Sequence, residues 1–303
     1  MMAYVVDANV HVIAAGRRRY PVAPLRGKLP AWAGGAHSTA EAFLEHMRIA
    51  GVHQAALAHP ASVYGYDNSC CLDSASRYPE SFVALGAIDV ADQEAGAALR
   101  WLVEQRGLGA IRFERRDARD PSEWLDAPAT MSLWQEAARH RTCVSLPTVR
   151  RMSDLPALRR VLERFPTVRV LLRRMAGAPA EDGPPYEAAK DLFALAEFPN
   201  VYLTFSQHNI EDARKGKSNP QAFFEAFISK FGARRLMWGS FFPANRATPE
   251  APYKGLVDRV REELSFLQQD DRDWLLGETA RNLFPSLRDA AGQKAKDYAG
   301  LAP

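Results

Sequence analysis

The chain has 303 residues, of which 47% are hydrophobic and 25% are charged, the balance of an ordinary soluble globular protein. Its 39 Lys and Arg residues nearly match its 36 Asp and Glu residues, so the net charge of +3 argues against nucleic-acid binding through bulk charge. The N-terminus shows no secretory signal, and no run of about 18 apolar residues predicts a membrane span. Three cysteines without Cys-x-x-Cys spacing indicate a cytoplasmic protein with free thiols.

Short apolar, β-branched runs alternate along the chain with amphipathic stretches, a pattern that predicts a parallel sheet covered by helices. The first helix is predicted to begin after Ser38, an N-cap with Glu41 three residues later as a capping box, and to end at Gly51. The predicted strands are Tyr4–Val12, Val52–His59, Phe82–Ile88, Leu108–Phe113, Thr142–Leu146, Thr167–Leu172, Asn200–Phe205 and Arg235–Gly239, and further predicted helices include Asp154–Arg164, Pro185–Phe198 and Pro220–Phe231.

Eight strand-like runs, each followed by a helix, fit a closed (β/α)₈ barrel, the TIM barrel of the α/β class, better than an open sheet. No Gly-rich phosphate-binding sequence follows the first run, which removes the best signature of a nucleotide-binding fold. We expect one barrel domain over residues 1–287 and a loosely held tail over residues 288–303, which are small and polar. The functional site is expected at the carboxyl ends of the strands, where barrel enzymes keep their sites.

Several stretches of sequence occur in an order that is typical of one family. They are VVDANVHV with RYPVAP, AGVHQAALAHPASVYGYDNSCCLDSASRYPESFVALGAID, LGAIRFERR, LLRRMAGAP, RLMWGSFFP and LLGETARNLFP. Together they resemble the amidohydrolase-related family that includes 2-pyrone-4,6-dicarboxylate lactonase, and the resemblance runs from Val5 to Pro285. It implies a (β/α)₈ barrel and a hydrolase ancestor that acted on lactones, amides or related carbonyl compounds.

The metal-binding positions of that family are largely replaced in this chain. In the family, strand 1 ends in a His-x-His pair, whereas this chain has Asn9 and His11. Strand 6 usually carries an Asp-His pair, where Arg173 and Arg174 stand here, and Phe241 replaces the acidic residue after strand 8. An amide is a poor ligand, a guanidinium repels a cation, and the missing acid is the usual activator of water. We therefore expect no bound metal and no other cofactor.

The residues left at the strand ends suggest acid–base chemistry without a metal. His11, with His59 as the alternative, is expected to move a proton, although each is weighed against a histidine bonded to a neighbouring carbonyl. Arg174 is expected to project into the former metal space and stabilise an oxyanion or a carboxylate. The alternative for Arg174 is an ion pair with a buried acid such as Asp7. Arg173 is expected to point the other way.

Substrate contacts are expected from several further positions around the same strand ends. By resemblance, Arg112 stands where related lactonases bind a substrate carboxylate. Asp67 is expected to cap the next helix, His208 is weighed against an ordinary surface histidine, and only one of Phe241 and Phe242 can line the cavity. The predicted substrate-binding residues are Arg112, Asn9, Tyr64, Tyr66, Asn68, His208 and Phe241.

The leading hypothesis is a metal-independent hydrolase that acts on a small carboxylated lactone, ester or amide. The alternatives are a lyase or isomerase in the same pocket, or a non-catalytic barrel that binds a small molecule or a protein partner. A shifted metal site formed by His11, His59 and His208 is a third alternative. The expected partner is a small anionic substrate, with no nucleic acid and no membrane, and homo-oligomerisation is left open.

Overall fold

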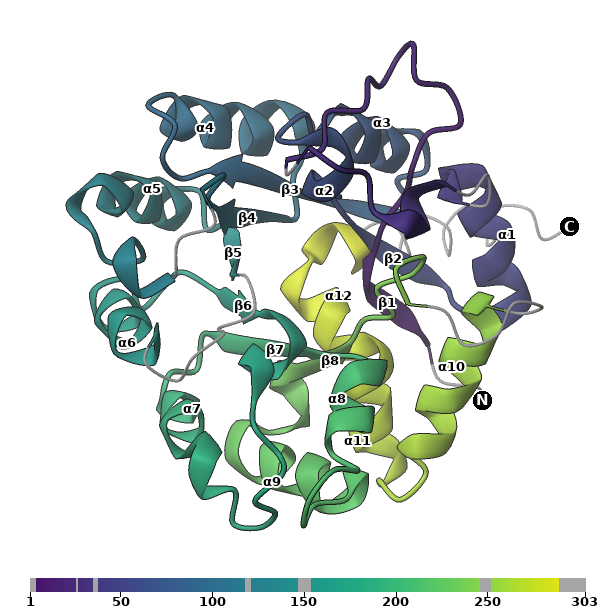
Figure 1. Ribbon diagram of the computed structural model, residues 1–303, viewed down its shortest axis with the longest axis vertical. Helices are drawn as coiled ribbons and strands as arrows, with labels where there is room; N and C mark the ends of the chain where they lie inside the picture. The colour runs from purple at the N-terminus through teal and green to yellow at the C-terminus, as the bar shows by residue number, and fades with distance from the viewer. Residues whose placement is uncertain are drawn as a thin grey trace, which may run out of the picture.

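The computed structural model describes residues 4–25, 27–34, 38–117, 121–146, 154–245 and 252–288. Their eight strands form one parallel sheet in which each strand pairs with the next along the chain (Figure 1). β1 lies against β8, and Phe241 N donates to Asn9 O at 2.8 Å just beyond them, so the sheet curls into a barrel. The predicted single (β/α)₈ barrel is confirmed. The strands are β1 (Val6–Val10), β2 (Gln54–Ala58), β3 (Phe82–Asp89), β4 (Ala110–Glu114), β5 (Cys143–Leu146), β6 (Val170–Leu172), β7 (Val201–Phe205) and β8 (Leu236–Trp238).

Helices connect successive strands and surround the barrel (Figure 1). The α-helices are α1 (Ala40–Ala50), α2 (Ala61–Tyr64), α3 (Ser69–Arg77), α4 (Ala95–Arg106), α5 (Pro128–Arg139), α6 (Leu155–Arg164), α7 (Lys190–Ala194), α8 (Gln207–Asp212), α9 (Pro220–Phe231), α10 (Pro252–Glu263), α11 (Gln269–Asp273) and α12 (Thr279–Leu283). Shorter turns of helix are η1 (Ala31–Gly34), η3 (Pro121–Glu123), η5 (Arg173–Gly177), η6 (Glu187–Ala189), η7 (Leu195–Glu197), η8 (Ala233–Arg235) and η9 (Trp274–Glu278).

The helix predictions are confirmed where local signals are strong. The predicted helix Pro220–Phe231 is α9, and the stop at Gly51 is confirmed because Gly51 adopts a left-handed φ of 65°. The predicted cap of α1 is displaced by one residue, because Thr39 Oγ1 accepts from Ala42 N at 3.2 Å. Ser38 is buried, and its carbonyl accepts from Ile13 N at 2.7 Å. The stretch predicted as one helix over 185–198 is broken into η6, α7 and η7.

The inside of the barrel is filled from its amino end. One side of each strand contributes apolar side chains, which pack against the last helix, α12, and the turn after it. Gln54, at the start of β2, donates to Leu287 O at 2.8 Å, and Arg169, just before β6, donates to Leu283 O at 3.0 Å. These bonds place α12 across the amino end of the barrel. Open space for a ligand is therefore left at the carboxyl ends of the strands.

Three expectations concern the chain as a whole. Within the described ranges, no helix has the length and apolar character needed to cross a bilayer. Of the predicted tail over 288–303, only Arg288 falls among the described residues, so the division into barrel and tail stays a prediction. Cys70, Cys71 and Cys143 are free and buried, as expected for unpaired thiols.

Candidate active site

At the carboxyl ends of β4 and β6, two arginines converge on one carboxylate. Arg112 Nη2 donates to Glu114 Oε1, and Arg173 Nη2 lies 3.4 Å from the same oxygen. The three side chains are between 9% and 15% exposed. A backbone carbonyl holds one further nitrogen of each guanidinium, because Arg112 Nη1 donates to His59 O at 2.6 Å and Arg173 Nε donates to Leu146 O at 3.1 Å. The buried Nε of Arg112 has no partner among the described residues. We call Arg112, Glu114 and Arg173 the charge cluster.

Strand alternation explains why these side chains meet. Ala110 points into the barrel, so Arg112 and Glu114, two and four residues later on β4, point the same way. Leu171 is the inward residue of β6, so Arg173 shares its side of the strand. The prediction that Arg173 points away is therefore wrong. Glu114 was not predicted, although its spacing of two residues from Arg112 was the signal that would have found it.

The charge cluster carries one net positive charge at neutral pH. Burial alone would raise the pKa of the Glu114 carboxyl, but the charges of Arg112 and Arg173 outweigh burial and hold this pKa below its ordinary value. Burial, assisted by the neighbouring Arg112, lowers the pKa of Arg173 to about 9, so the guanidinium stays protonated at neutral pH. Two cations and one anion remain, and this excess of positive charge favours an anionic ligand.

His11 and His59 stand beside the charge cluster as neutral rings. His11 Nδ1 lies 2.7 Å from Ala58 O, and His59 Nε2 lies 2.7 Å from Gly65 O. Because a carbonyl oxygen only accepts, these nitrogens carry the protons, which leaves His11 Nε2 and His59 Nδ1 unprotonated. Burial, with the nearby Arg112, lowers the pKa of His11 to about 3 and that of His59 to about 4. Each ring therefore offers one nitrogen that accepts a hydrogen bond or a proton.

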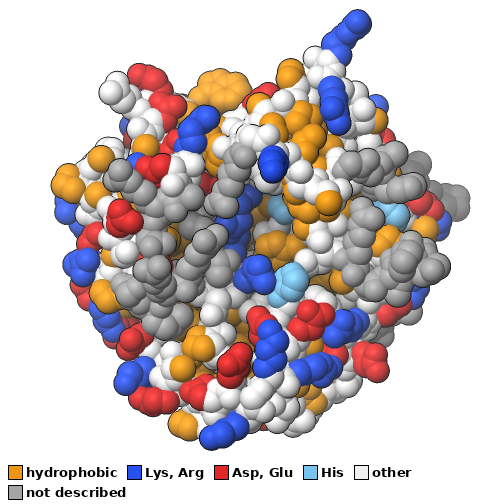
Figure 2. Space-filling view, in the orientation of Figure 1, with side chains coloured by type: hydrophobic (Ala, Val, Ile, Leu, Met, Phe, Trp, Pro, Cys, Tyr) orange, Lys and Arg blue, Asp and Glu red, His pale blue; other side chains and the backbone are white. Residues whose placement is uncertain are grey.

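A cavity of about 390 Å³ lies beside these groups. Figure 2 shows Lys and Arg side chains together with a histidine near the middle of the face that looks toward the viewer. Trp32 stacks on His11, with ring centroids 5.5 Å apart and planes inclined by 23°. The residues that line the cavity are His11, Leu25, Lys28, Leu29, Pro30, Pro60, Ala61, Ser62, Arg112 and Glu114.

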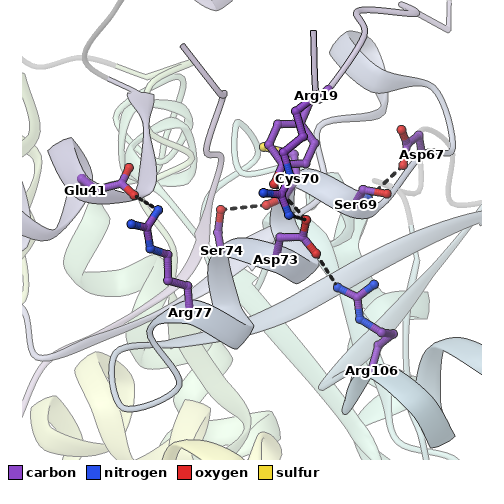
Figure 3. Close-up of polar contacts among 10 residues, drawn as sticks. Arg19, Glu41, Asp67, Ser69, Cys70, Asp73, Ser74, Arg77 and Arg106 are labelled. Atoms are coloured by element: carbon purple, nitrogen blue, oxygen red, sulfur yellow. Dashed lines mark hydrogen bonds and ion pairs between the residues drawn. The ribbon is translucent and has the colours of Figure 1, made fainter. Parts of the chain in front are cut away.

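One wall of the cavity is the segment that follows β1, and this segment is joined to α3 by one ion pair and one hydrogen bond. Asp73 of α3 accepts from Arg19 and from Tyr20 Oη, each at 2.9 Å, and from Arg106 of α4 at 2.7 Å (Figure 3). Further along the segment, Leu25 N donates to Ala61 O at 3.3 Å. The cavity wall is therefore anchored both to the outer helices and to the loop after β2.

The Tyr-Gly-Tyr-Asp-Asn stretch after β2 has mainly structural contacts. Tyr64 is buried and its hydroxyl accepts from Ala14 N at 3.0 Å, while Asn68 bonds both the N–H and the C=O of Ala87. Neither residue lines the cavity, and their contact with substrate stays a prediction. Tyr66 differs, because its buried hydroxyl has no hydrogen-bond partner in the described chain. Asp67 accepts from Ser69 N, the first residue of α3, at 3.0 Å, although the N-cap residue of that helix is Asn68, whose side chain makes no capping bond (Figure 3).

The substrate-binding residues that were predicted at the ends of β1 and β8 lie in different surroundings. Asn9 is buried, and its Oδ1 has no partner in the part of the chain that the structure describes. Phe242 packs in the core against Phe43 and Tyr253, whereas Phe241 is partly exposed and has a left-handed φ of 56°. The two phenylalanines do not share one environment, and neither is among the residues that line the cavity, so the contact of Phe241 with substrate stays a prediction.

Asp7 and His208 have partners other than those considered for them. Asp7 accepts from Asn9 N, from Ser240 N and from the Tyr253 hydroxyl, so these donors take the place of the ion pair with Arg174 that was the alternative. Burial raises the pKa of Asp7 to about 6. His208 lies on α8, its side chain is 43% exposed, and its Nε2 lies 2.8 Å from Asn245 Oδ1. It belongs to the rim and does not line the cavity.

The chain turns sharply after Arg173 through a left-handed turn, η5. Arg174, Met175 and Ala176 have φ values of 53°, 51° and 53°, each costing about 1–2 kcal/mol for an L-residue. Thr204 Oγ1 accepts from Arg174 N, and Asn209 Nδ2 donates to Arg174 O, both at 3.0 Å. These bonds from β7 and α8 hold the strained turn. Both of these hydrogen bonds are made by the backbone of Arg174, so the role of its guanidinium stays a prediction.

The family resemblance implies a divalent metal ion, and the residues present do not fit one. Within the described ranges, no three His, Cys, Asp or Glu side chains converge closely enough to hold an ion. The expected ligand positions hold the amide of Asn9, the guanidinium of Arg173 and the ring of Phe241. The carboxylate of Glu114 is engaged by two guanidiniums, whose charges would repel a divalent cation.

A nearly closed (β/α)₈ barrel with a cavity at the carboxyl ends of its strands has the architecture of a barrel enzyme. Residues 6–286 match the family described as Amidohydrolase, so the chain belongs to the amidohydrolase family. The predicted family is thereby confirmed, and with it the expectation of a hydrolase at the level of the family.

Individual relatives agree with this placement. The chain is 29% identical over 183 residues to L-fucono-1,5-lactonase from Burkholderia ambifaria, a match that spans 59% of this chain and 61% of that relative. A probable 2-pyrone-4,6-dicarboxylic acid hydrolase from Acinetobacter baumannii, solved with citric acid bound, has a TM-score of 0.72 at 16% identity, over 93% of this chain and 99% of that one. 5-Carboxyvanillate decarboxylase from Sphingomonas paucimobilis has a TM-score of 0.67 at 15% identity, over 94% and 99%. These structures share the fold.

Proposed function

We propose that the protein is a metal-independent hydrolase that acts on a small carboxylated lactone, ester or amide. The observation that carries the proposal is the convergence of two guanidiniums on one carboxylate, beside two neutral imidazoles, at the mouth of the barrel. The name of the lactonase relative supports a lactone as substrate, and the citric acid bound to the barrel from Acinetobacter baumannii supports a carboxylated ligand.

In this proposal the arginines bind and polarise the substrate. A guanidinium binds a carboxylate through two parallel hydrogen bonds, so Arg112 takes the substrate carboxylate. Arg173, with Arg174 at the rim, stabilises the negative charge that develops on the carbonyl oxygen when water attacks. Both functions use the excess positive charge of the site.

His11 transfers the proton. Its Nδ1–H is held by Ala58 O, so the unprotonated Nε2 takes a proton from the attacking water while the water oxygen bonds to the carbonyl carbon. The protonated ring then returns this proton to the leaving alkoxide or amine. The ring by itself is a weak base, because burial lowers the pKa of His11 to about 3. The negative charge of a bound carboxylate raises this pKa, because it favours the protonated ring. His59 is the alternative proton acceptor.

The first experiment is elemental analysis of the native protein and of a chelator-treated sample, each assayed on a panel of carboxylated lactones. We expect no stoichiometric metal and the same turnover in both samples. One metal ion per chain, lost on chelation together with the activity, would refute the metal-independent mechanism.

A second experiment compares neighbouring arginines. Arg173→Met should lower kcat/KM by roughly 100-fold or more, the usual effect of removing one charge-stabilising donor. Arg174→Met tests the rim position in the same assay. We expect a smaller loss of kcat/KM, because the hydrogen bonds of Arg174 to Thr204 and Asn209 are made by its backbone. Arg160→Met is the control, because Arg160 is 60% exposed and pairs with Asp126 on the outer surface. Unchanged kinetics in both Arg173→Met and Arg174→Met would contradict the proposal.

The alternatives make different predictions for the same site. A non-catalytic barrel is expected to fill its mouth with aromatic side chains and ion pairs, whereas a cavity of about 390 Å³ remains here and Phe242 lies in the core. A lyase is favoured by Phe241, which stands where the family places its water-activating acid. Release of carbon dioxide from a carboxylated aromatic acid, without turnover of any lactone, would decide for the lyase. The cytoplasmic location and the oligomeric state stay predictions.

A further inference from the structure

The charge cluster contains a carboxylate that a carboxylated substrate has to approach. Glu114 lines the cavity together with Arg112 and His11. Its carboxylate neutralises one of the two positive charges that Arg112 and Arg173 bring to the site. One negative charge on a ligand therefore balances the cluster, and a second negative charge does not.

The rest of the cavity wall is poor in groups that receive an anion. Five apolar residues line it, namely Leu25, Leu29, Pro30, Pro60 and Ala61. Lys28 is the cation that the described chain adds to this wall, and it is exposed, so water screens its charge. A second carboxylate lies either beside Glu114, where like charges repel, or against a largely apolar wall, where it loses hydration and meets only the exposed Lys28 and Ser62 as donors among the described lining residues.

We propose that Glu114 restricts this site to ligands that carry a single carboxylate, and that it rejects dicarboxylates of similar shape. The restriction rests on the proposed function, because it takes the site to be the binding site of a carboxylated substrate. It goes further by naming the charge of that substrate and the residue that selects it. The body of the ligand is an apolar or planar group, which the apolar wall and the ring of His11 accommodate.

Benzoate and isophthalate test the selection, because they share a ring and differ by one carboxylate. We expect wild-type protein to bind benzoate at least about tenfold more tightly than isophthalate in calorimetric titrations at neutral pH, since two like charges a few ångströms apart at the protein surface repel by more than a factor of ten in affinity. In Glu114→Gln the preference should reverse, because the second carboxylate then supplies the missing negative charge between the two guanidiniums.

Two further variants make the test specific. Glu263→Gln is the matched control, because Glu263 accepts from Arg214 and forms a second ion pair with Arg259 at 3.8 Å, and its side chain is 15% exposed like that of Glu114. It lies on α10, in the outer layer of helices, and should keep the wild-type preference. Glu114→Asp keeps the negative charge but moves it away from the cavity, because the side chain is one methylene shorter. Its preference for benzoate over isophthalate should therefore lie between those of wild type and Glu114→Gln. This variant decides the question if Glu114→Gln does not fold.

The outcomes separate this inference from the proposed function. Equal affinity of the wild-type protein for both acids would overturn the selection by Glu114, while the carboxylate site of the proposed function would stand. A wild-type preference for benzoate that persists unchanged in both Glu114 variants would also overturn it, because another group would then be the cause. Absence of binding of either acid to wild type and variants would overturn both proposals.

Discussion

Replacing His59 with glutamine should remove a part of the acid sensitivity of this fold. The side chain of His59 is fully buried, and its Nε2 donates to Gly65 O at 2.7 Å. A glutamine amide donates to the same carbonyl, so the variant keeps the hydrogen bond and loses the titrating ring. The expected difference in the free energy of unfolding between wild type and His59→Gln therefore comes from protonation of the His59 ring.

The magnitude follows from the shift in pKa. Burial, with the charge of Arg112, lowers the pKa of His59 from 6.5 in the unfolded chain to about 4 in the fold. The unfolded chain thus binds the proton first as the pH falls. The stability that the neutral ring contributes is present above pH 6.5 and is lost as the pH falls toward 4. At a pH of about 5, linkage gives a loss of about 2 kcal/mol in the free energy of unfolding.

Urea unfolding at pH values of about 7.5 and about 5 measures this loss. The free energy of unfolding of wild type should decrease by about 2 kcal/mol more than that of His59→Gln between the two pH values. The titration of His11 occurs in both proteins and cancels in the comparison. His208→Gln, at a ring that is 43% exposed, should follow wild type. Parallel decreases in wild type and His59→Gln would refute the reasoning.

Three further predictions concern the structure around the site. The pKa of Asp7 is raised to about 6 in the fold, so its contribution to the free energy of unfolding falls as the pH rises from about 4 to about 6. Asp7→Asn should reduce this fall by up to about 3 kcal/mol in urea unfolding, and an unchanged pH dependence would contradict the prediction. Thr204→Val removes the hydroxyl that accepts from Arg174 N in the left-handed turn after β6. The variant should lower the free energy of unfolding by about 1–3 kcal/mol and raise KM. An unaltered midpoint of urea unfolding would show that the turn does not need this hydrogen bond. Gly239→Ala would place a Cβ 2.9 Å from Asn9 Cβ and should lower the free energy of unfolding by about 1–3 kcal/mol, which a lower melting temperature would show. Gly96→Ala, in α4 with no atom within 4 Å of the added Cβ, should raise the melting temperature slightly.

The barrel was predictable because its signals are local. A parallel strand that is buried on both faces is a short apolar run, and all eight predicted runs overlap a strand of the structure. The helix at Pro220–Phe231 was predicted without error because Asn219 caps it, proline occupies its first turn and Gly232 ends it. The helix predicted over 185–198 failed in part, because its amphipathic pattern carries no information on the turns that interrupt it.

The site was predictable only in its position along the strands. Strand ends could be located from sequence, and His11 and His59 were selected in this way, whereas Arg112 was selected by the family resemblance. The direction of Arg173 was wrong because it was judged from its neighbour Arg174 and not from the alternation along β6. Nothing in the sequence Arg-Arg-Met-Ala-Gly indicates a left-handed turn, since three of its residues disfavour that conformation.

The sequence by itself determined the eight strands, their order and the end of the barrel that carries the site, because hydrophobic period and helix signals depend on residues a few positions apart. Only the tertiary structure decided that Glu114 receives both Arg112 and Arg173, and which nitrogen of His11 is free. These properties depend on groups from different strands that meet when the barrel closes. They depend also on the burial that closure imposes, and burial is what moves the pKa of a histidine or a carboxyl.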